Sequence, residues 1–307
     1  MPALYELLSK TSRTFALAIP LLPEPTQSTV CLSYLLFRVA DTLEDAKTWS
    51  RAARLEALAE WGELLVEFDA RRARAAKARW IAAEATRDDG YRELLDEVPH
   101  VLNELSRLAQ QAQRIVCEHA LRTVQGMRST LEGADVAGNI RIESLEQLRS
   151  YCYIAAGIVG ELLTALFVRD FPVLERVRPA LVENQVAFGE GLQLVNILKD
   201  AAQDAREGRV YLPESVRRTA IIELARADLV RARCYIDALR AGGAPPGLCA
   251  FTGLSAELAE ATLVRIEEDG PGAKVARADV MRMYARYRLA ASESVAADHS
   301  AIAHSGK

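Results

Sequence analysis

The stretch Gln193-Leu-Val-Asn-Ile-Leu-Lys-Asp200-Ala-Ala-Gln-Asp204 places Gln193, Asn196, Asp200 and Asp204 at intervals of three and four residues. Side chains with this spacing lie on one face of an α-helix. The turns before them, within Phe188–Val195, are mostly apolar or small. The stretch therefore predicts a packed helix that presents two amides and two carboxylates near its end.

An earlier stretch, Asp41-Thr-Leu-Glu-Asp45, repeats the pair of carboxylates four residues apart and adds Glu44. Tyr34 and Arg38 precede Asp41 on the same predicted helix face. Carboxylates near the end of a helix oppose its dipole. Two such charges ~6 Å apart at an effective dielectric constant of ~20 also repel by roughly 3 kcal/mol. The pattern therefore indicates a functional role for these acids.

Two acidic helix faces turned toward each other would bind a hard divalent cation. Oxygen ligands suit Mg²⁺, which retains waters and commonly shares carboxylate sites with phosphates. Arg38 on the first face and Lys199 beside the second supply positive charge for such an anion. We therefore predict a Mg²⁺–diphosphate site between the two helices, with metal ligands Asp41, Glu44, Asp45, Asn196, Asp200 and Asp204.

Composition favours an all-α protein, because half of the 307 residues are hydrophobic, only 6% are aromatic and runs of β-branched residues are short. No linker is long enough to separate domains. We predict a single-domain α-helical bundle over residues 1–307 with a central cavity and a flexible tail from about residue 295. Expected helices cover Thr26–Asp45, Arg51 to about Ala85, about His100–Leu131, Ser144–Phe167, Pro172 or Pro179 to about Glu207, and Thr219–Arg240, with two more separated by Asp269–Gly272.

Charge and cysteine content exclude several classes of function. The net charge of −4 does not favour nucleic acid as a partner, and we interpret the basic run 71–79 as a solvated helix face. Five scattered cysteines and four histidines show no metal-ligand spacing, which disfavours zinc sites and disulfide scaffolds.

The chain shows no signal for insertion into a membrane. Its N-terminus lacks a signal-peptide pattern, and the apolar stretch Tyr153–Val168 is too short for a spanning helix. We expect a cytoplasmic protein that contacts membranes transiently, at their surface, to release product. Nothing in the sequence indicates an oligomeric state.

Tyr151 begins a helix stripe that continues through Ala155, Val159 and Leu162. The small residues within 155–160 either leave room for a long apolar ligand or allow a close helix–helix contact. A phenol above an apolar cavity can stabilise a cation with its ring or carry a proton on its hydroxyl.

Taken together, these motifs resemble those of the squalene/phytoene synthase family, over most of the chain. The matching segments are Thr11-Ser-Arg-Thr-Phe15, Asp41-Thr-Leu-Glu-Asp45, Tyr151-Cys-Tyr-Ile-Ala-Ala-Gly-Ile-Val-Gly160, Asn196-Ile-Leu-Lys-Asp200-Ala-Ala-Gln-Asp204 and Gly208-Arg-Val-Tyr-Leu-Pro213. The resemblance implies an isoprenoid-synthase fold and Mg²⁺-dependent, head-to-head condensation of two prenyl diphosphates.

The resemblance also assigns roles to individual residues. It implies catalytic roles for Tyr151, Asp41, Asp45, Asp200 and Asp204. It implies substrate binding by Ser12, Arg13, Thr14, Phe15, Tyr34, Arg38, Val159, Gln193 and Lys199.

Within the family, Asp41–Asp45, Leu94–Pro99 and Leu248–Ala250 resemble squalene synthases, whereas Arg206–Pro213 resembles phytoene synthases. The expected reaction therefore converts two farnesyl diphosphates through presqualene diphosphate to squalene, with NADPH as reductant. Lys274 and Arg277 are the expected NADPH-binding residues. The alternative is a phytoene or dehydrosqualene synthase that performs no reduction.

Three positions depart from the family pattern: Gln203 stands where Glu is usual, Lys199 where Arg is common, and Leu248 where reducing squalene synthases carry Phe. Two other classes of function remain open on the residues alone. One is an all-α nucleotide pyrophosphohydrolase, which would not need an apolar cavity. The other is a non-catalytic assembly factor, which would be expected to lose the motif aspartates.

Overall fold

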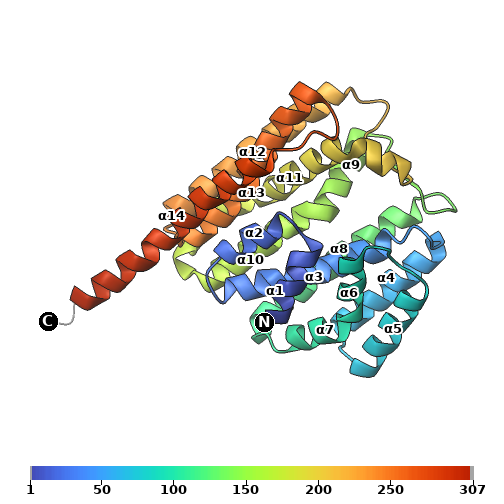
Figure 1. Ribbon diagram of the computed structural model, residues 1–307, viewed down its shortest axis with the longest axis horizontal. Coiled ribbons are helices and arrows are strands. Elements are labelled where there is room, and N and C mark those ends of the chain that lie inside the picture. Colours follow the sequence, from blue (N-terminus) through green and yellow to red (C-terminus); the bar gives the residue numbers. More distant parts are fainter. Residues whose placement is uncertain (1, 305–307) are drawn as a thin grey trace.

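The computed structural model describes residues 2–304, with side chains over residues 3–292. Most of this chain is helical and its two strands have two residues each, which confirms the predicted all-α class (Figure 1). The longer helices are α1 (Pro2–Thr11), α3 (Thr26–Glu44), α4 (Arg51–Val66), α5 (Ala70–Ala82), α6 (Asp89–Asp96), α7 (Val98–Ser106), α8 (Gln110–Glu132), α9 (Leu145–Cys152), α10 (Ile158–Asp170), α11 (Arg178–Arg206), α12 (Arg218–Ala241), α13 (Pro246–Asp269) and α14 (Arg277–His304). The short elements are α2 (Phe15–Ala18), the 3₁₀ helices Ile19–Leu21 and Pro172–Val177, the π-helical turn Tyr153–Gly157, and strands β1 (Ile140–Arg141) and β2 (Arg209–Val210).

The long helices α11, α12, α13 and α14 run along one side of the molecule, and α4 to α8 form the opposite side (Figure 1). Helix α11 packs against α10, α12 and α13, whereas α3 packs against α4 and α8. Helices α3 and α11, which carry the two acidic faces, therefore belong to different halves of the bundle.

Two of the predicted helices are each divided in the structure. The helix predicted from Arg51 to Ala85 is α4 followed by α5, because the Asp69 carboxylate accepts hydrogen bonds from the N–H groups of Arg71 and Arg72 and starts a new helix. The helix predicted over 100–131 is α7 followed by α8, with a break at residues 107–109. Apolar periodicity continues across both breaks, so it did not reveal them.

The helix predicted from Ser144 begins as expected, because the Ser144 hydroxyl accepts a hydrogen bond from the N–H of Gln147 at 3.1 Å. It then contains the π-helical turn Tyr153–Gly157 between α9 and α10. The turn inserts one extra residue, so side chains before and after it no longer share one face at regular spacing.

Helices α10 and α11 approach each other so closely that only glycine fits at two positions. A Cβ at Gly160 would collide with the carbonyl oxygen of Gln185, and a Cβ at Gly189 would collide with that of Ala156. The small residues after Tyr151 therefore allow a close helix–helix contact, and Ala155, Ala156 and Gly160 also line an apolar cavity, so the two alternatives do not exclude each other.

Strands β1 and β2 lie in parallel, in segments outside the predicted helices. The N–H of Ile140 donates to the carbonyl oxygen of Gly208 at 2.9 Å, and that of Ile142 donates to Val210 at 2.8 Å. This short ladder fixes the segment that follows α11 against the segment that follows α8.

Helix α14 continues to His304 and extends beyond the rest of the bundle (Figure 1). The predicted tail from about residue 295 therefore has a helical backbone as far as His304, and residues 305–307 lie outside the described residues. The flexibility of this segment stays a prediction.

Two helical segments are long and apolar enough to cross a membrane, Leu145–Asp170 and Pro246–Asp269. The expectation that no segment reaches this length was therefore wrong, because the π-helical turn does not interrupt the helix. More than half of each 18-residue apolar window is buried within the protein. A core helix of a soluble protein has the same length and composition, so these helices do not by themselves indicate membrane insertion.

Candidate active site

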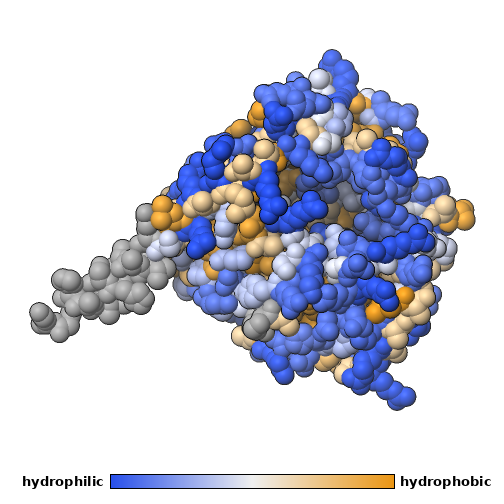
Figure 2. Space-filling view, viewed as in Figure 1, coloured by the Kyte–Doolittle hydropathy of each residue, from blue (hydrophilic) through white to orange (hydrophobic). Residues whose placement is uncertain are grey.

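The carboxylates of both acidic stretches line one cavity of about 340 Å³. Figure 2 shows a hollow near the middle of the visible face, with hydrophobic residues inside it and hydrophilic residues around it. The residues that line the cavity are Arg38, Asp41, Glu44, Asp45, Met127, Tyr151, Ile154, Ala155, Gln193, Asn196, Ile197, Asp200, Asp204, Arg209 and Tyr211. The structure thus brings together all six predicted metal ligands; their role as ligands stays a prediction.

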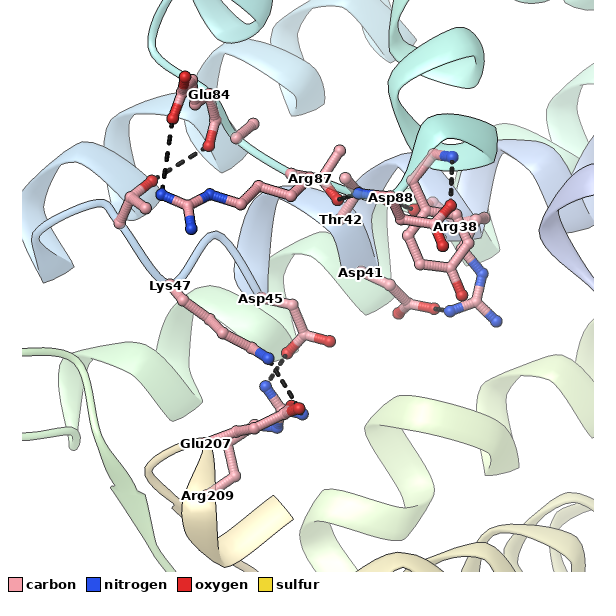
Figure 3. A pocket seen from close by; sticks show the side chains of 14 residues that line it. Arg38, Asp41, Thr42, Asp45, Lys47, Glu84, Arg87, Asp88, Glu207 and Arg209 are labelled. Carbon is pink, nitrogen blue, oxygen red and sulfur yellow. Dashed lines mark hydrogen bonds and ion pairs between the residues drawn. The ribbon is translucent and has the colours of Figure 1, made fainter. Parts of the chain in front are cut away.

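Arg209 joins the two acidic helices. Its guanidinium lies 3.1 Å from the Asp45 carboxylate at the end of α3 and 3.2 Å from the Asp204 carboxylate near the end of α11. Glu207 pairs with Arg209 at 2.5 Å and with Lys47 at 2.7 Å, so Asp45, Lys47, Glu207 and Arg209 form one cluster (Figure 3). The resemblance to the family included Arg209 in the segment Gly208–Pro213 but assigned it no role in the site.

Crowding of the acids changes their protonation. Burial, with help from Asp45, raises the pKa of Asp41 to about 6 although the Arg38 guanidinium lowers it. Burial and the neighbouring Asp45 and Asp41 raise the pKa of Glu44 well above its usual value. Burial also raises the pKa of Asp45 and Asp204, against the opposing effect of Arg209. The cavity therefore disfavours the charged forms of these acids unless a further cation lies beside them.

This donor set fits Mg²⁺ bound together with a diphosphate. One oxygen of Glu44, Oε1, is buried and has no hydrogen-bond partner among the described residues. No three Asp, Glu, His or Cys side chains of the described residues are close enough to enclose a metal ion by themselves. Mg²⁺ ordinarily takes one or two carboxylates and completes its coordination with water and substrate phosphates. An open, acid-lined cavity meets that requirement.

Arg38 is held in place on the wall of the cavity. Its Nη1 lies 3.2 Å from the Asp41 carboxylate, and its Nε donates to the Tyr34 hydroxyl at 3.2 Å. The Tyr34 hydroxyl in turn donates to the carbonyl oxygen of Thr11 at 2.8 Å. The Arg38 guanidinium also lies over the Tyr91 ring, with 5.4 Å to the centroid. Arg38 is therefore positioned to bind an anion beside Asp41.

A second, mainly apolar cavity of about 200 Å³ continues from the first. The two cavities share Arg38, Asp41, Ala155, Gln193 and Asn196 in their walls. The apolar walls come from α3, α10, α11 and α13 and from the segment around α2, and they comprise Phe15, Ile19, Val30, Phe37, Val159, Leu162, Leu163, Phe188, Leu192 and Phe251. An acid-lined cavity thus opens into a mainly apolar pocket.

Tyr151 lines the acidic cavity close to its junction with the apolar pocket, since its helix neighbour Ala155 lines both. The Tyr151 ring stacks on the Tyr211 ring with 4.3 Å between centroids, and the Tyr151 hydroxyl donates to the Tyr211 hydroxyl at 2.8 Å. Burial, with a smaller contribution from the neighbouring acids, raises the pKa of both phenols far above 10, so both are neutral near pH 7. Sequence reasoning did not identify Tyr211, although it lies two residues after Arg209.

Some predicted site residues lie outside both cavities. Ser12, Arg13 and Thr14 form the turn into α2, where the Ser12 hydroxyl accepts a hydrogen bond from the N–H of Phe15 at 3.0 Å. Neither cavity wall includes these three residues. Lys199 lies beside the cavity, and its ammonium group is 3.2 Å from the Asp200 carboxylate.

The predicted NADPH-binding residues are Lys274 and Arg277. Lys274 lies in the loop between α13 and α14, and Arg277 is the first residue of α14. Both side chains are exposed. The N–H of Gly272 donates to the carbonyl oxygen of Lys199 at 2.8 Å, which fixes this loop against α11. Neither cation makes an ion pair within the described part of the chain.

Comparison with known proteins gives consistent results. The family model for squalene/phytoene synthase matches residues 8–220. Squalene synthase of Bos taurus is 30% identical over 213 residues, which are 68% of this chain and 46% of that protein. Squalene synthase of Homo sapiens is 29% identical over 215 residues, 69% of this chain and 46% of that protein. The chain therefore spans about half the length of these curated relatives.

Among solved structures, TcSQS in complex with the ligand BPH1237 is 25% identical, has a TM-score of 0.73, and the match covers 94% of this chain and 86% of that one. A dehydrosqualene synthase in complex with a ligand has a TM-score of 0.58 at 19% identity, covering 94% of this chain and 95% of that one, which shows the fold alone. The all-α arrangement matches these neighbours, and the family model covers more than two thirds of the chain. The chain belongs to the squalene/phytoene synthase family.

Proposed function

We propose that this protein is a Mg²⁺-dependent prenyltransferase that joins two farnesyl diphosphates head to head, through presqualene diphosphate, to squalene. One observation carries the proposal: the acid-lined cavity and the apolar pocket are continuous and share Arg38, Asp41, Gln193 and Asn196. An amphipathic substrate with a charged diphosphate and a long hydrocarbon chain fits such a site.

The chain's own residues divide the work of ionising the first substrate. The carboxylates of α3 and α11 would hold Mg²⁺, which, when bound, would neutralise charge on the departing diphosphate. Arg38 and Arg209 contribute fixed positive charge to the same cavity and bind diphosphate oxygens. Because the apolar pocket excludes water, the allylic cation left behind reacts with the second prenyl chain instead of being hydrolysed.

Tyr151 would act at the junction of the two cavities. In the structure it donates its own proton to Tyr211, so its remaining lone pairs and its ring are available to a cationic substrate. The phenol ring stabilises the carbocation, and the hydroxyl relays the proton lost when the cyclopropane ring closes to an oxygen of the departed diphosphate. Tyr211 orients Tyr151 for both roles.

NADPH, when bound, would supply the hydride that converts the final cation to squalene. Lys274 and Arg277 would hold its phosphates, because both are exposed cations on a loop attached to α11 beside Lys199. If alanine at both positions leaves NADPH-dependent formation of squalene unchanged, this part of the proposal is wrong.

The other candidate functions are less consistent with the site. A nucleotide pyrophosphohydrolase would not need the apolar pocket behind Asp41. A non-catalytic assembly factor would not need to retain Asp41, Asp45, Asp200 and Asp204, all of which line one cavity. A phytoene or dehydrosqualene synthase would use the same cavities and differs only in chain length or in the lack of reduction.

The test is incubation of the purified protein with C15 or C20 prenyl diphosphate and Mg²⁺, with and without NADPH, followed by mass analysis of extracted products. We expect presqualene diphosphate from the C15 substrate and squalene when NADPH is present. A C40 product from C20 substrate alone would favour a phytoene synthase. A C30 dehydro product in the presence of NADPH would favour a dehydrosqualene synthase. No turnover of either substrate would refute the proposal.

A further inference from the structure

The lining of the apolar pocket extends along α3 and α11, away from the carboxylates. Along α3 its wall runs from Asp41 to Val30, a rise of about 16 Å at 1.5 Å per residue. Along α11 it runs from Asn196 to Phe188, a rise of about 12 Å. Phe188 is therefore the wall residue of α11 that lies farthest from the carboxylates, and it lies where the end of a bound hydrocarbon chain would reach.

The ring of Phe188 is supported from behind. Phe188 is only 2% exposed and stacks on the Tyr235 ring of α12, with 5.3 Å between centroids and 29° between planes. Tyr235 is completely buried. Phe251 also lines the pocket, but the described residues show no aromatic ring stacked against it. Phe15 pairs with the ring of Tyr34, but Tyr34 itself lines the pocket, whereas the Tyr235 ring supports Phe188 from outside the lining.

Tyr235 is itself fixed by a directed hydrogen bond. The Thr164 hydroxyl donates to the carbonyl oxygen of Gly160 at 3.0 Å, so it must accept in its 3.0 Å contact with the Tyr235 hydroxyl. Tyr235 therefore donates to Thr164 on α10. This bond ties α12 to α10 behind the Phe188 ring and prevents the Tyr235 ring from swinging aside.

The backbone at Phe188 is equally restrained. Its neighbour Gly189 lies against the carbonyl oxygen of Ala156, and Gly160 lies against that of Gln185. Helix α11 therefore has no room to shift toward α10, and neither the backbone nor the ring of Phe188 can yield to a longer ligand without disrupting packed neighbours.

We propose that Phe188 is the end wall of the hydrocarbon pocket and determines the longest prenyl chain that the enzyme accepts, with Tyr235 and Thr164 as its positioning residues. This inference rests on the proposed prenyltransferase function and adds the structural basis for its preference for C15 over C20 substrate. Removing the ring at position 188 opens space for one further isoprene unit.

The test compares kcat/KM for C20 and C15 prenyl diphosphates in the wild type and in Phe188→Ala and Phe188→Leu. We expect the C20/C15 ratio to rise by about 10-fold or more in Phe188→Ala, since one hydrocarbon group in a pocket is worth roughly 10- to 200-fold in specificity. Phe188→Leu leaves a smaller void and serves as the second variant in case Phe188→Ala does not fold. It should raise the C20/C15 ratio by less than Phe188→Ala does. Products of the variants should include C40 hydrocarbon by mass.

Two further variants test the support behind Phe188 and the specificity of the effect: Tyr235→Phe and Phe167→Ala. Tyr235→Phe keeps the stacked ring but removes the bond to Thr164, so the C20/C15 ratio should rise modestly. Phe167 is fully buried on α10 but does not line the pocket, so Phe167→Ala should lower thermal stability without changing the ratio.

An unchanged C20/C15 ratio in folded Phe188→Leu, or an equal change of this ratio in Phe167→Ala, would overturn the inference while leaving the proposed function intact. A wild type that consumes neither substrate would instead refute the proposed function, and the inference with it.

Discussion

Arg209 is the residue through which the ends of the two acidic helices contact each other. It pairs with Asp45 from α3 and Asp204 from α11 and is only 13% exposed at its side chain. Its guanidinium stands between carboxylates that would otherwise repel. Burial nevertheless raises the pKa of Asp41, Glu44 and Asp45, so the folded protein disfavours their charged forms. A cation bound beside these carboxylates would stabilise the charged forms.

We expect Asp41→Asn and Asp200→Asn to lower turnover by at least about two orders of magnitude, because each removes one charged oxygen ligand from the transition-state site. Circular dichroism should show an intact fold. Asp237→Asn, at an exposed position on α12, should retain wild-type rates. Full activity of the wild type in excess chelator would contradict a metal-dependent role for these acids.

Tyr151→Phe should reduce kcat by about 10²- to 10⁴-fold, the range for loss of one acid–base group, with a much smaller change in KM. Tyr211→Phe keeps the stacked ring but removes the acceptor for the Tyr151 proton, so we expect a smaller loss of kcat and altered proportions of products. Steady-state kinetics with product analysis measure both effects. Wild-type kinetics in Tyr151→Phe would remove that residue from the mechanism.

At the scale of secondary-structure elements, the contact between α10 and α11 determines the shape of the pocket. A methyl group at position 160 would displace the backbone of α11 at Gln185. We expect Gly160→Ala to destabilise the protein by about 1–3 kcal/mol, as overpacked cores do, and to impair activity. Denaturant unfolding measures the change.

Gly62→Ala is a matched control in α4, because a Cβ there meets Val124 at an ordinary 3.5 Å. This variant should be neutral or more stable by up to about 1 kcal/mol, since alanine favours helix over glycine. Equal stability of Gly160→Ala and the wild type would show that the two helices can separate at little cost.

Helix α9 is anchored by Arg149, two residues before Tyr151. The Arg149 guanidinium lies 2.8 Å from Glu190 on α11 and 2.6 Å from Asp228 on α12. Burial raises the pKa of Glu190 to about 7, with Asp228 adding to the effect and Arg149 opposing it. The folded protein therefore binds a proton at Glu190 between about pH 4.5 and 7 that the unfolded chain has released.

A group whose pKa is higher in the folded protein than in the unfolded chain stabilises the fold fully at pH values below its unfolded pKa. This stabilisation is lost as the pH rises through the pKa of the folded protein. We expect the thermal stability of the metal-free protein to receive a contribution from Glu190 that decreases from pH 4.5 to 7. Glu190→Gln should flatten this dependence, whereas Glu183→Gln, an exposed position on the same helix, should not. A steeper decrease in Glu190→Gln would contradict the assignment.

At the scale of the whole molecule, the two most apolar helical segments are also those that line the hydrocarbon pocket. Ala155, Val159 and Leu163 of the 145–170 segment and Phe251 of α13 all contribute to its wall. Packing in the core and lining of the apolar pocket account for the hydropathy of both segments.

We therefore expect the expressed protein to behave as a peripheral membrane protein at most. Alkaline carbonate should release it from a membrane fraction, because each apolar segment is more than half buried in the bundle. Immunoblotting of the supernatant and pellet measures this. Retention in the pellet until detergent is added would contradict the expectation and indicate insertion of one of the two segments.

The sequence determined the all-α class, the two acidic helix faces and the family, because these depend on local spacing: residues three and four apart share a helix face wherever the helix packs. It also placed most residues of the two cavities on the correct elements, among them Asp41, Asp204 and Tyr151. Breaks such as the one at residues 67–69 were missed, because a new cap interrupts a helix without interrupting the apolar pattern.

The tertiary structure alone decided which side chains meet across elements. Arg209 reaches Asp45, Tyr211 stacks on Tyr151, and Tyr235 supports Phe188, each pair separated by at least 47 positions in the chain. It also left Ser12, Arg13 and Thr14 outside the cavities. Contacts of this kind depend on how helices cross and on how closely they approach each other. Gly160 and Gly189 permit a close approach here. The periodicity of residues along one helix carries no information about either quantity.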